Sequence, residues 1–281
     1  MLVRVNPAQC IQVMIQQPFR ANRRQFLSTL SAGAAFAVVN PANALVTGNT
    51  LPVPPASASP ADLAKDEAFW REVAGYYDRT RGAINLEHGY WGKMAHPVQA
   101  AYLDATRMVN AQNSFYARRE YDDDLKLAIS RIANALGAEE EEIAITRNAT
   151  ESIHNLIRQY KGLKPGDAVL LADIDYPGFK STMHWMKQGR NVDVVEIRIP
   201  ERARQQQILE IYLQAFDANP HIRMMLITHI SNQHGLVVPV ADIAREARKR
   251  GIDIICDAAQ SWGLVDYRIG DLGVDYAGFN L

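Results

Sequence analysis

Short apolar runs alternate with amphipathic stretches over the second half of the chain. The apolar runs have the length of strands, and the residues between them show helical spacing. We expect strands at 143–145, 168–172, 192–198, 224–228, 252–256 and 275–279. We expect helices at 151–160, 179–188, 208–216 and 240–250. This alternation predicts βαβ units, and therefore a three-layer α/β fold with a mostly parallel sheet between layers of helices.

The preceding region is predicted to be helical. Apolar residues recur at helical spacing over 62–77, 97–110 and 122–136, and Gly137 follows the last stretch as a usual C-terminal stop. Faces of this kind are more often packing surfaces than binding surfaces. We therefore place one large domain at 62–281.

The N-terminal segment differs in composition from the rest of the chain. The pair Arg23-Arg24 precedes an apolar run at 30–39 and a small-residue cleavage pattern that ends at Ala44. This order resembles a twin-arginine signal peptide over 1–44, which implies export to the periplasm. The alternative is a chance arginine pair before a core helix. The apolar run is shorter than the roughly 20 residues that a membrane span needs, so we expect no membrane anchor after cleavage. The segment 45–61 is predicted to be a linker because it is rich in proline.

Composition narrows the function classes. The 281 residues carry a net charge of -1, which gives no bias toward nucleic acid. The two cysteines are Cys10 and Cys256, so the domain has one thiol and neither an internal disulfide nor a cysteine-based zinc cluster. The sequence contains none of the usual glycine-rich dinucleotide or P-loop motifs, the zincin motif, or the hydrolase nucleophile motif.

Candidate chemistry follows two of the expected strands. Asp257 comes directly after the buried run 252–256 and is followed by two alanines and Gln260. Ala149 and Thr150 begin the helix that follows 143–145, where free backbone N–H groups favour an anion. Each feature has a structural alternative, because Asp often caps a strand end and Thr often caps a helix. Ligands in such sheets gather at the carboxyl ends of the strands, so we expect these residues to share a site.

The string Asp257-Ala258-Ala259-Gln260 after a buried strand resembles class V aminotransferases, which are pyridoxal phosphate (PLP) enzymes. The resemblance implies that Asp257 bonds the protonated pyridine nitrogen, that Ala259 packs against one ring face, and that Gln260 reaches the phenolic oxygen. A carboxylate beside the ring nitrogen raises the pKa of that nitrogen and keeps the ring an electron sink.

The same resemblance assigns the remaining candidate residues. It places the PLP phosphate at Ala149 and Thr150 and stacks Tyr176 on the outer face of the ring, although a Tyr before Pro is often only a turn residue. The implied substrate-binding residues are Asn85, His229 and Asn232. A lone His at a strand end is more often a core residue than a ligand.

In the family, the strand that resembles 275–279 leads to a His-Lys pair whose lysine forms the Schiff base with PLP. We expect that lysine beyond Leu281, together with a small C-terminal domain, so no catalytic residue is assigned within the chain. The resemblance implies an amino-acid substrate and transamination or epimerisation of the isopenicillin N epimerase type. It also implies a homodimer for the full-length protein. The alternatives are a cysteine desulfurase or lyase of the same fold, and a catalytically inactive truncated remnant.

Overall fold

A computed structural model describes residues 52–281. The signal peptide predicted at 1–44, and the first part of the linker predicted at 45–61, lie outside these residues. The chain divides into two compact units. Residues up to Gly82 and Lys93–Ala117 form the first, and Ala83–Gly92 together with Arg118–Leu281 form the second. Each unit is described by itself below.

The first unit is helical. Instead of the single helix predicted at 62–77, it has α1 (Pro60–Leu63) and α2 (Glu67–Ala74). The break occurs because the Asp66 side chain accepts hydrogen bonds from the N–H groups of Ala68 and Phe69, so the backbone starts a second helix there. The predicted helix at 97–110 is α3 (His96–Gln112), which begins with a proline in its first turn.

α4 (Ser114–Arg119) leads from the first unit into the second. The second unit then begins its helical part with α5 (Tyr121–Leu136), as predicted. α5 ends at Gly137, whose φ of 69° is left-handed and explains why glycine stops the helix there. A short 3₁₀ helix, η3 (Glu140–Glu142), follows. The strand predicted at 143–145 is wrong, since these residues form an extended segment that pairs with no strand of the sheet.

The centre of the second unit is a five-stranded parallel sheet in the order β2-β1-β3-β4-β5. The strands are β1 (Ala168–Ala172), β2 (Asp193–Ile197), β3 (Ile222–Thr228), β4 (Asp253–Asp257) and β5 (Tyr276–Gly278). The predicted parallel α/β sheet is therefore confirmed. Because β2 and β3 lie on opposite sides of β1, the chain changes direction between β1 and β3, and ligands bind at the carboxyl end of such a switch point.

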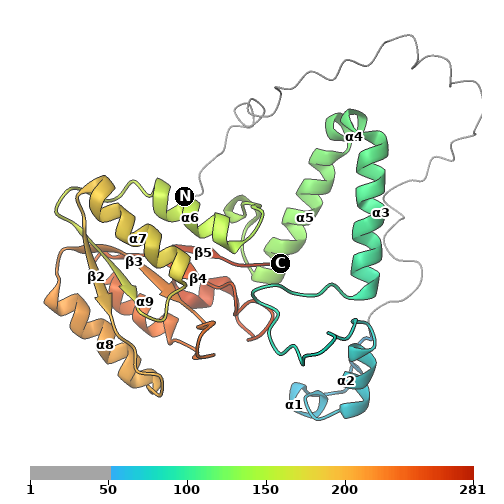
Figure 1. Cartoon of the computed structure of the whole chain (residues 1–281), viewed down its shortest axis with the longest axis horizontal. Helices are drawn as coiled ribbons and strands as arrows, with labels where there is room; N and C mark the ends of the chain where they lie inside the picture. Colours follow the sequence, from blue (N-terminus) through green and yellow to red (C-terminus); the bar gives the residue numbers. More distant parts are fainter. Residues whose placement is uncertain (1–51) are drawn as a thin grey trace, which may run out of the picture. The chain divides into compact units, whose positions relative to one another are not determined.

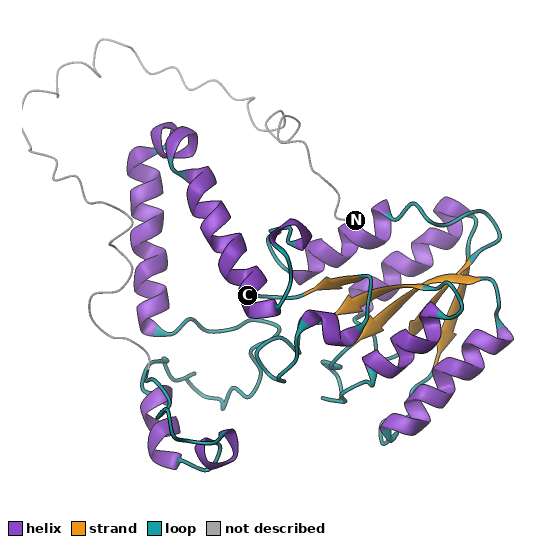
Figure 2. Cartoon of the chain, turned by 180° about the vertical axis from the view of Figure 1, so that it is seen from behind, coloured by secondary structure: helices purple, strands orange, loops and turns teal. Residues whose placement is uncertain are grey.

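Helices cover both faces of this sheet, as Figures 1 and 2 show. One face packs against α6 (Ala149–Gln159) and α7 (Pro177–Arg190) through a core that includes Val169, Leu226 and Ile255. The other face packs against α8 (Gln205–Ala218) and α9 (Val240–Arg248), and a 3₁₀ helix, η4 (Ile269–Leu272), joins this second core. Successive strand residues point to opposite faces, so both cores come from the same continuous apolar runs.

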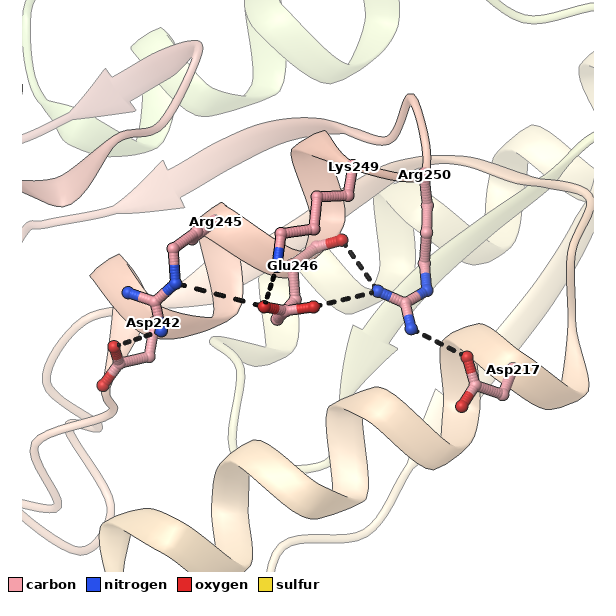
Figure 3. A network of polar contacts seen from close by, with 6 residues as sticks. All are labelled: Asp217, Asp242, Arg245, Glu246, Lys249 and Arg250. Atoms are coloured by element: carbon pink, nitrogen blue, oxygen red, sulfur yellow. Dashed lines mark hydrogen bonds and ion pairs between the residues drawn. The ribbon is translucent and has the colours of Figure 1, made fainter.

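A network of charged side chains joins α8 to α9 on the surface (Figure 3). Arg250 contacts Asp217 at 2.9 Å and Glu246 at 3.3 Å, and its guanidinium lies over the Phe216 ring. The network continues through Lys249, Arg245 and Asp242. Exposed ion pairs contribute little stability, so the packing of α8 and α9 depends mainly on their apolar faces.

Among residues 52–281, no helix is long and apolar enough to cross a bilayer. The same part of the chain contains no cluster of His, Cys, Asp and Glu that could hold a metal ion.

Candidate cofactor site

A cavity of about 150 Å³ opens within the second unit at the carboxyl ends of β1, β3 and β4. Every residue predicted to bind the cofactor lines this cavity, and so does Asn232. The predicted residues brought together are Ala149, Thr150, Tyr176, Asn232, Asp257, Ala259 and Gln260. They come from segments far apart in the sequence, and parallel strands bring them to one edge of the sheet.

His229 and Asn85 are not among the residues that line the cavity. His229 is 7% exposed, and its ring packs edge-on against Tyr267 with centroids 4.9 Å apart. Burial lowers the pKa of His229, and within residues 52–281 its Nδ1 has no hydrogen-bond partner. The structure thus places the His229 ring against Tyr267 and outside the lining of the cavity. Asn85 is exposed in the loop 83–92.

Asp257 ends β4 and presents a carboxylate to the cavity. It is 7% exposed, and burial raises the pKa of Asp257 to about 6. The Ala259 N–H donates to its Oδ1 at 3.0 Å and opposes that rise. A carboxylate this deeply buried is stabilised when a cation lies beside it. A protonated ring nitrogen would be such a cation.

The N-terminus of α6 supplies backbone donors. The first N–H groups of a helix have no partner inside the helix. The Ala149 N–H donates to Asn280 Oδ1 at 3.0 Å, and the Glu151 N–H donates to Asn148 Oδ1 at 2.8 Å. The N–H of Thr150 lies between these two, and Thr150 is exposed and lines the cavity. The positive end of the helix and this donor fit a phosphate group.

Tyr176 provides an aromatic ring at the cavity wall. It precedes Pro177, which begins α7, and its ring packs edge-on against Phe179 with centroids 5.2 Å apart. Phe179 itself is 2% exposed and lines the cavity. The ring of Tyr176 is therefore held by a buried neighbour rather than free in a surface turn.

A loop from the same unit borders the cavity. Glu87 Oε1 accepts a hydrogen bond from Gln260 Nε2 at 3.0 Å, and Asn280 Nδ2 donates to the Gly89 carbonyl at 3.3 Å. Gly89 and Tyr90 line the cavity together with Gln260. Asn280 thus connects this loop to the first turn of α6 through Ala149.

The sequence interpretation assigned no role to Thr228, Asn280 or Asp175. Thr228 and Asn280 line the cavity, and Asp175 bonds Thr228 through a fully buried carboxylate. Asp175 follows the expected strand 168–172, and Thr228 ends the expected strand 224–228, so position alone could have identified both. Asn280 directly follows the strand expected at 275–279, so its position was a signal too, but its contacts with residues 131 and 191 positions away could not be inferred.

The residues present fit PLP. An anion-binding helix N-terminus, an aromatic ring and a buried carboxylate surround one cavity, and these correspond to the phosphate, the ring and the ring nitrogen of the cofactor. The fold and cavity define a class of protein: a doubly wound α/β domain suited to a phosphorylated aromatic cofactor.

The chain belongs to the aminotransferase class V family, whose model matches residues 98–280. The family, the α/β fold class and the PLP cofactor that the sequence led us to expect are therefore confirmed.

The relatives include proteins with different activities. The chain is 27% identical over 210 residues to an isopenicillin N epimerase from Amycolatopsis lactamdurans, covering 74% of this chain and 52% of that protein. It is 28% identical over 156 residues to a probable cysteine desulfurase from Methanothermobacter thermautotrophicus, covering 55% of this chain and 37% of that protein. The chain spans about half the length of the epimerases it matches.

Solved structures share the fold. The cystine C–S lyase C-DES, in complex with cysteine persulfide, matches with a TM-score of 0.52 at 19% identity, over 62% of this chain and 49% of that chain. The cysteine desulfurase CsdA from Escherichia coli matches with a TM-score of 0.50 at 20% identity, over 61% of this chain and 46% of that chain. At these identities the likeness concerns the fold alone.

Proposed function

We propose that the chain binds PLP in this cavity and that the protein acts on the α-carbon of an amino acid by transamination or epimerisation, as an isopenicillin N epimerase-like enzyme. The observation that carries the proposal is the meeting of Asp257, the N-terminus of α6 and Tyr176 around one cavity. When bound, PLP supplies an electron-withdrawing ring that makes bonds to the substrate α-carbon easier to break.

Six residues of the cavity have distinct parts in this proposal. The carboxylate of Asp257 holds the positive charge of the ring nitrogen, and the Thr150 N–H and hydroxyl hold the phosphate. Tyr176 orients the ring by stacking, and the small side chain of Ala259 leaves room for the opposite ring face. Gln260 donates or accepts at the phenolic oxygen, and Asn232 faces the same cavity. The family pattern assigns the proton-transferring lysine to a position after Leu281, and among the described residues no lysine lines the cavity.

A titration of the chain with PLP and with pyridoxal, which lacks the phosphate, tests the binding proposal. We expect PLP to bind at least roughly tenfold more tightly, because the α6 N-terminus interacts with the phosphate. Absence of PLP binding, or equal affinity for the two compounds, contradicts the proposal.

Cysteine desulfuration is the second candidate function, since relatives at similar identity and structures of the same fold have that activity in their names. Two assays on the full-length protein separate the candidates. Transamination converts the amino acid into a keto acid, and epimerisation inverts the configuration of its α-carbon, so analysis of the products detects both. Desulfuration transfers sulfur from cysteine, which is detected as sulfide in the presence of a reducing thiol.

We further propose that the protein is exported by the twin-arginine route and forms a homodimer. Support comes from the order of Arg23-Arg24, the apolar run and the cleavage pattern, and from the family resemblance. Periplasmic and cytoplasmic fractions of the parent and of the Arg23→Lys, Arg24→Lys double variant test export. Equal periplasmic recovery contradicts the route.

A further inference from the structure

A buried carboxylate with no assigned role lies next to the cavity. Asp175 is 1% exposed. Its Oδ2 accepts a hydrogen bond from the Ala172 N–H at 2.7 Å, and its Oδ1 accepts from the Thr228 N–H at 3.0 Å and the Thr228 hydroxyl at 2.7 Å. The Asp175 side chain therefore links the end of β1 to the end of β3. These are the two strands between which the switch point of the sheet lies.

Asp175 is connected to two residues of the cavity wall, one through the chain and one through a hydrogen bond. Tyr176 is the next residue in the chain, and Thr228 is the residue to which Asp175 bonds. Thr228 also pairs in register with Asp257 across β3 and β4. Asp175 thus ties the backbone that carries Tyr176 to Thr228, the strand neighbour of Asp257.

The negative charges of the Asp175 and Asp257 carboxylates repel each other. The pKa of Asp175 is raised to about 7 in all: burial raises it most, hydrogen bonds from Ala172 and Thr228 lower it, and the Asp257 charge raises it. Cys256 on β4 and Tyr212 on α8 also interact with Asp175, but burial raises the pKa of both well above their ordinary values, so both are neutral. Two buried carboxylates near one cavity repel each other, and a cation in the cavity relieves that repulsion.

We infer that Asp175 is a positioning residue for the cofactor: it fixes Tyr176 and Thr228 at the cavity wall and adds a second negative charge behind Asp257 that helps to keep the ring nitrogen protonated. This inference rests on the proposed PLP site and deepens it. It differs from a purely structural role, because a structural role predicts no change in the protonation of the ring.

PLP labelled with ¹⁵N at the ring nitrogen gives a direct readout, since the ¹⁵N chemical shift reports protonation. We would titrate the labelled cofactor bound to the parent chain and to Asp175→Asn across pH. The matched control is Asp173→Asn, because Asp173 accepts a hydrogen bond from the Ile199 N–H at 2.9 Å in the same segment, on the side of β2. Circular dichroism verifies that each variant folds.

We expect Asp175→Asn to lower the pH midpoint of the ring nitrogen by about one unit, and Asp173→Asn to retain the parent midpoint. Thr228→Val removes only the hydroxyl donor and should shift the midpoint in the same direction by a smaller amount. If Asp175→Asn does not fold, the midpoint of Thr228→Val tests the inference instead. An unchanged midpoint in the folded variants, or an equal shift in Asp173→Asn, overturns the inference while PLP binding stands. Absence of PLP from the parent chain contradicts the proposed function and the inference together.

Discussion

Gly89 and Gln260 approach so closely that a Cβ on Gly89 would lie 1.9 Å from the Gln260 side-chain oxygen. A side chain on Gly89 would therefore require the Gln260 amide or the loop to move from this position. The same loop is held by Glu87, whose carboxylate accepts from Gln260 Nε2. The position of Gln260 at the cavity thus depends on a residue more than 170 positions earlier in the chain.

Gly89→Ala is expected to displace the loop or the Gln260 amide and to weaken PLP binding. We expect the dissociation constant to rise by roughly a factor of ten, corresponding to about 1.4 kcal/mol. Gly270→Ala is the control, because a Cβ there meets no atom within 4 Å. Isothermal titration with PLP provides the measurement. An affinity for Gly89→Ala equal to that of the control would show that the loop does not shape the site.

Tyr176→Ala is expected to loosen PLP without abolishing binding, since aromatic stacking contributes on the order of 1 kcal/mol. Tyr176→Phe retains the ring and should keep the parent affinity. Equilibrium dialysis of PLP against the three proteins measures the difference. If Tyr176→Ala binds PLP as tightly as Tyr176→Phe, Tyr176 is only the turn residue before Pro177.

The stability of the chain without PLP should depend on pH through Asp175. Its folded pKa of about 7 lies above the ordinary value, so the folded state binds more protons than the unfolded state between about pH 4 and 7. The stabilising effect of that proton is complete below the unfolded pKa and is lost as pH rises through 7. His154 and His229, whose pKa values burial lowers, act in the opposite direction and are common to parent and variant.

The measurement is therefore a difference between the parent and Asp175→Asn. We expect the free energy of unfolding of the parent, relative to the variant, to fall by on the order of 2 kcal/mol from pH 5 to pH 8. Urea denaturation at both pH values gives this quantity, and Asp173→Asn serves again as the control. A pH-independent difference between parent and Asp175→Asn would show that Asp175 is ionised throughout.

Borohydride treatment of the 281-residue chain with PLP is expected to leave no specific covalent adduct. Borohydride fixes an imine between a lysine and the PLP aldehyde, and no lysine among residues 52–281 lines the cavity. Lys180, on α7, instead contacts Glu196 at 3.1 Å. Peptide mass mapping checks the outcome, with the full-length protein as the positive control. An adduct at one specific lysine of the 281-residue chain contradicts the placement of the reactive lysine after Leu281.

The parallel sheet could be predicted because its central strands are short, mostly apolar runs. β1 is buried at every position, and its predicted and observed bounds coincide at residues 168–172. The segment 143–145 has a similar composition but forms no strand, since hydrogen-bonded pairing depends on a neighbouring strand that local sequence does not reveal. The helix predicted at 62–77 was divided by the Asp66 cap, which apolar spacing alone does not detect.

The cavity residues that follow strands could be predicted for the same reason. Asp257 ends β4 and Tyr176 follows β1, and parallel strands bring such positions together. Contacts that depend on tertiary structure were not accessible in this way. Asn280 bonds Ala149 and Gly89, and Asp175 bonds Thr228, only because distant segments meet in the fold. Position after a strand can also mislead. His229 follows β3, but its side chain packs on Tyr267, whereas the preceding residue, Thr228, lines the cavity.

The central claim is that this cavity holds PLP with Asp257 at the ring nitrogen. A crystal structure of the chain grown with PLP tests it most directly. We predict the ring nitrogen within hydrogen-bonding distance of the Asp257 carboxylate, about 2.7–2.9 Å, and the phosphate at the Thr150 N–H on the N-terminus of α6. PLP bound at another place, or bound here with its phosphate toward Asp257, would contradict the account.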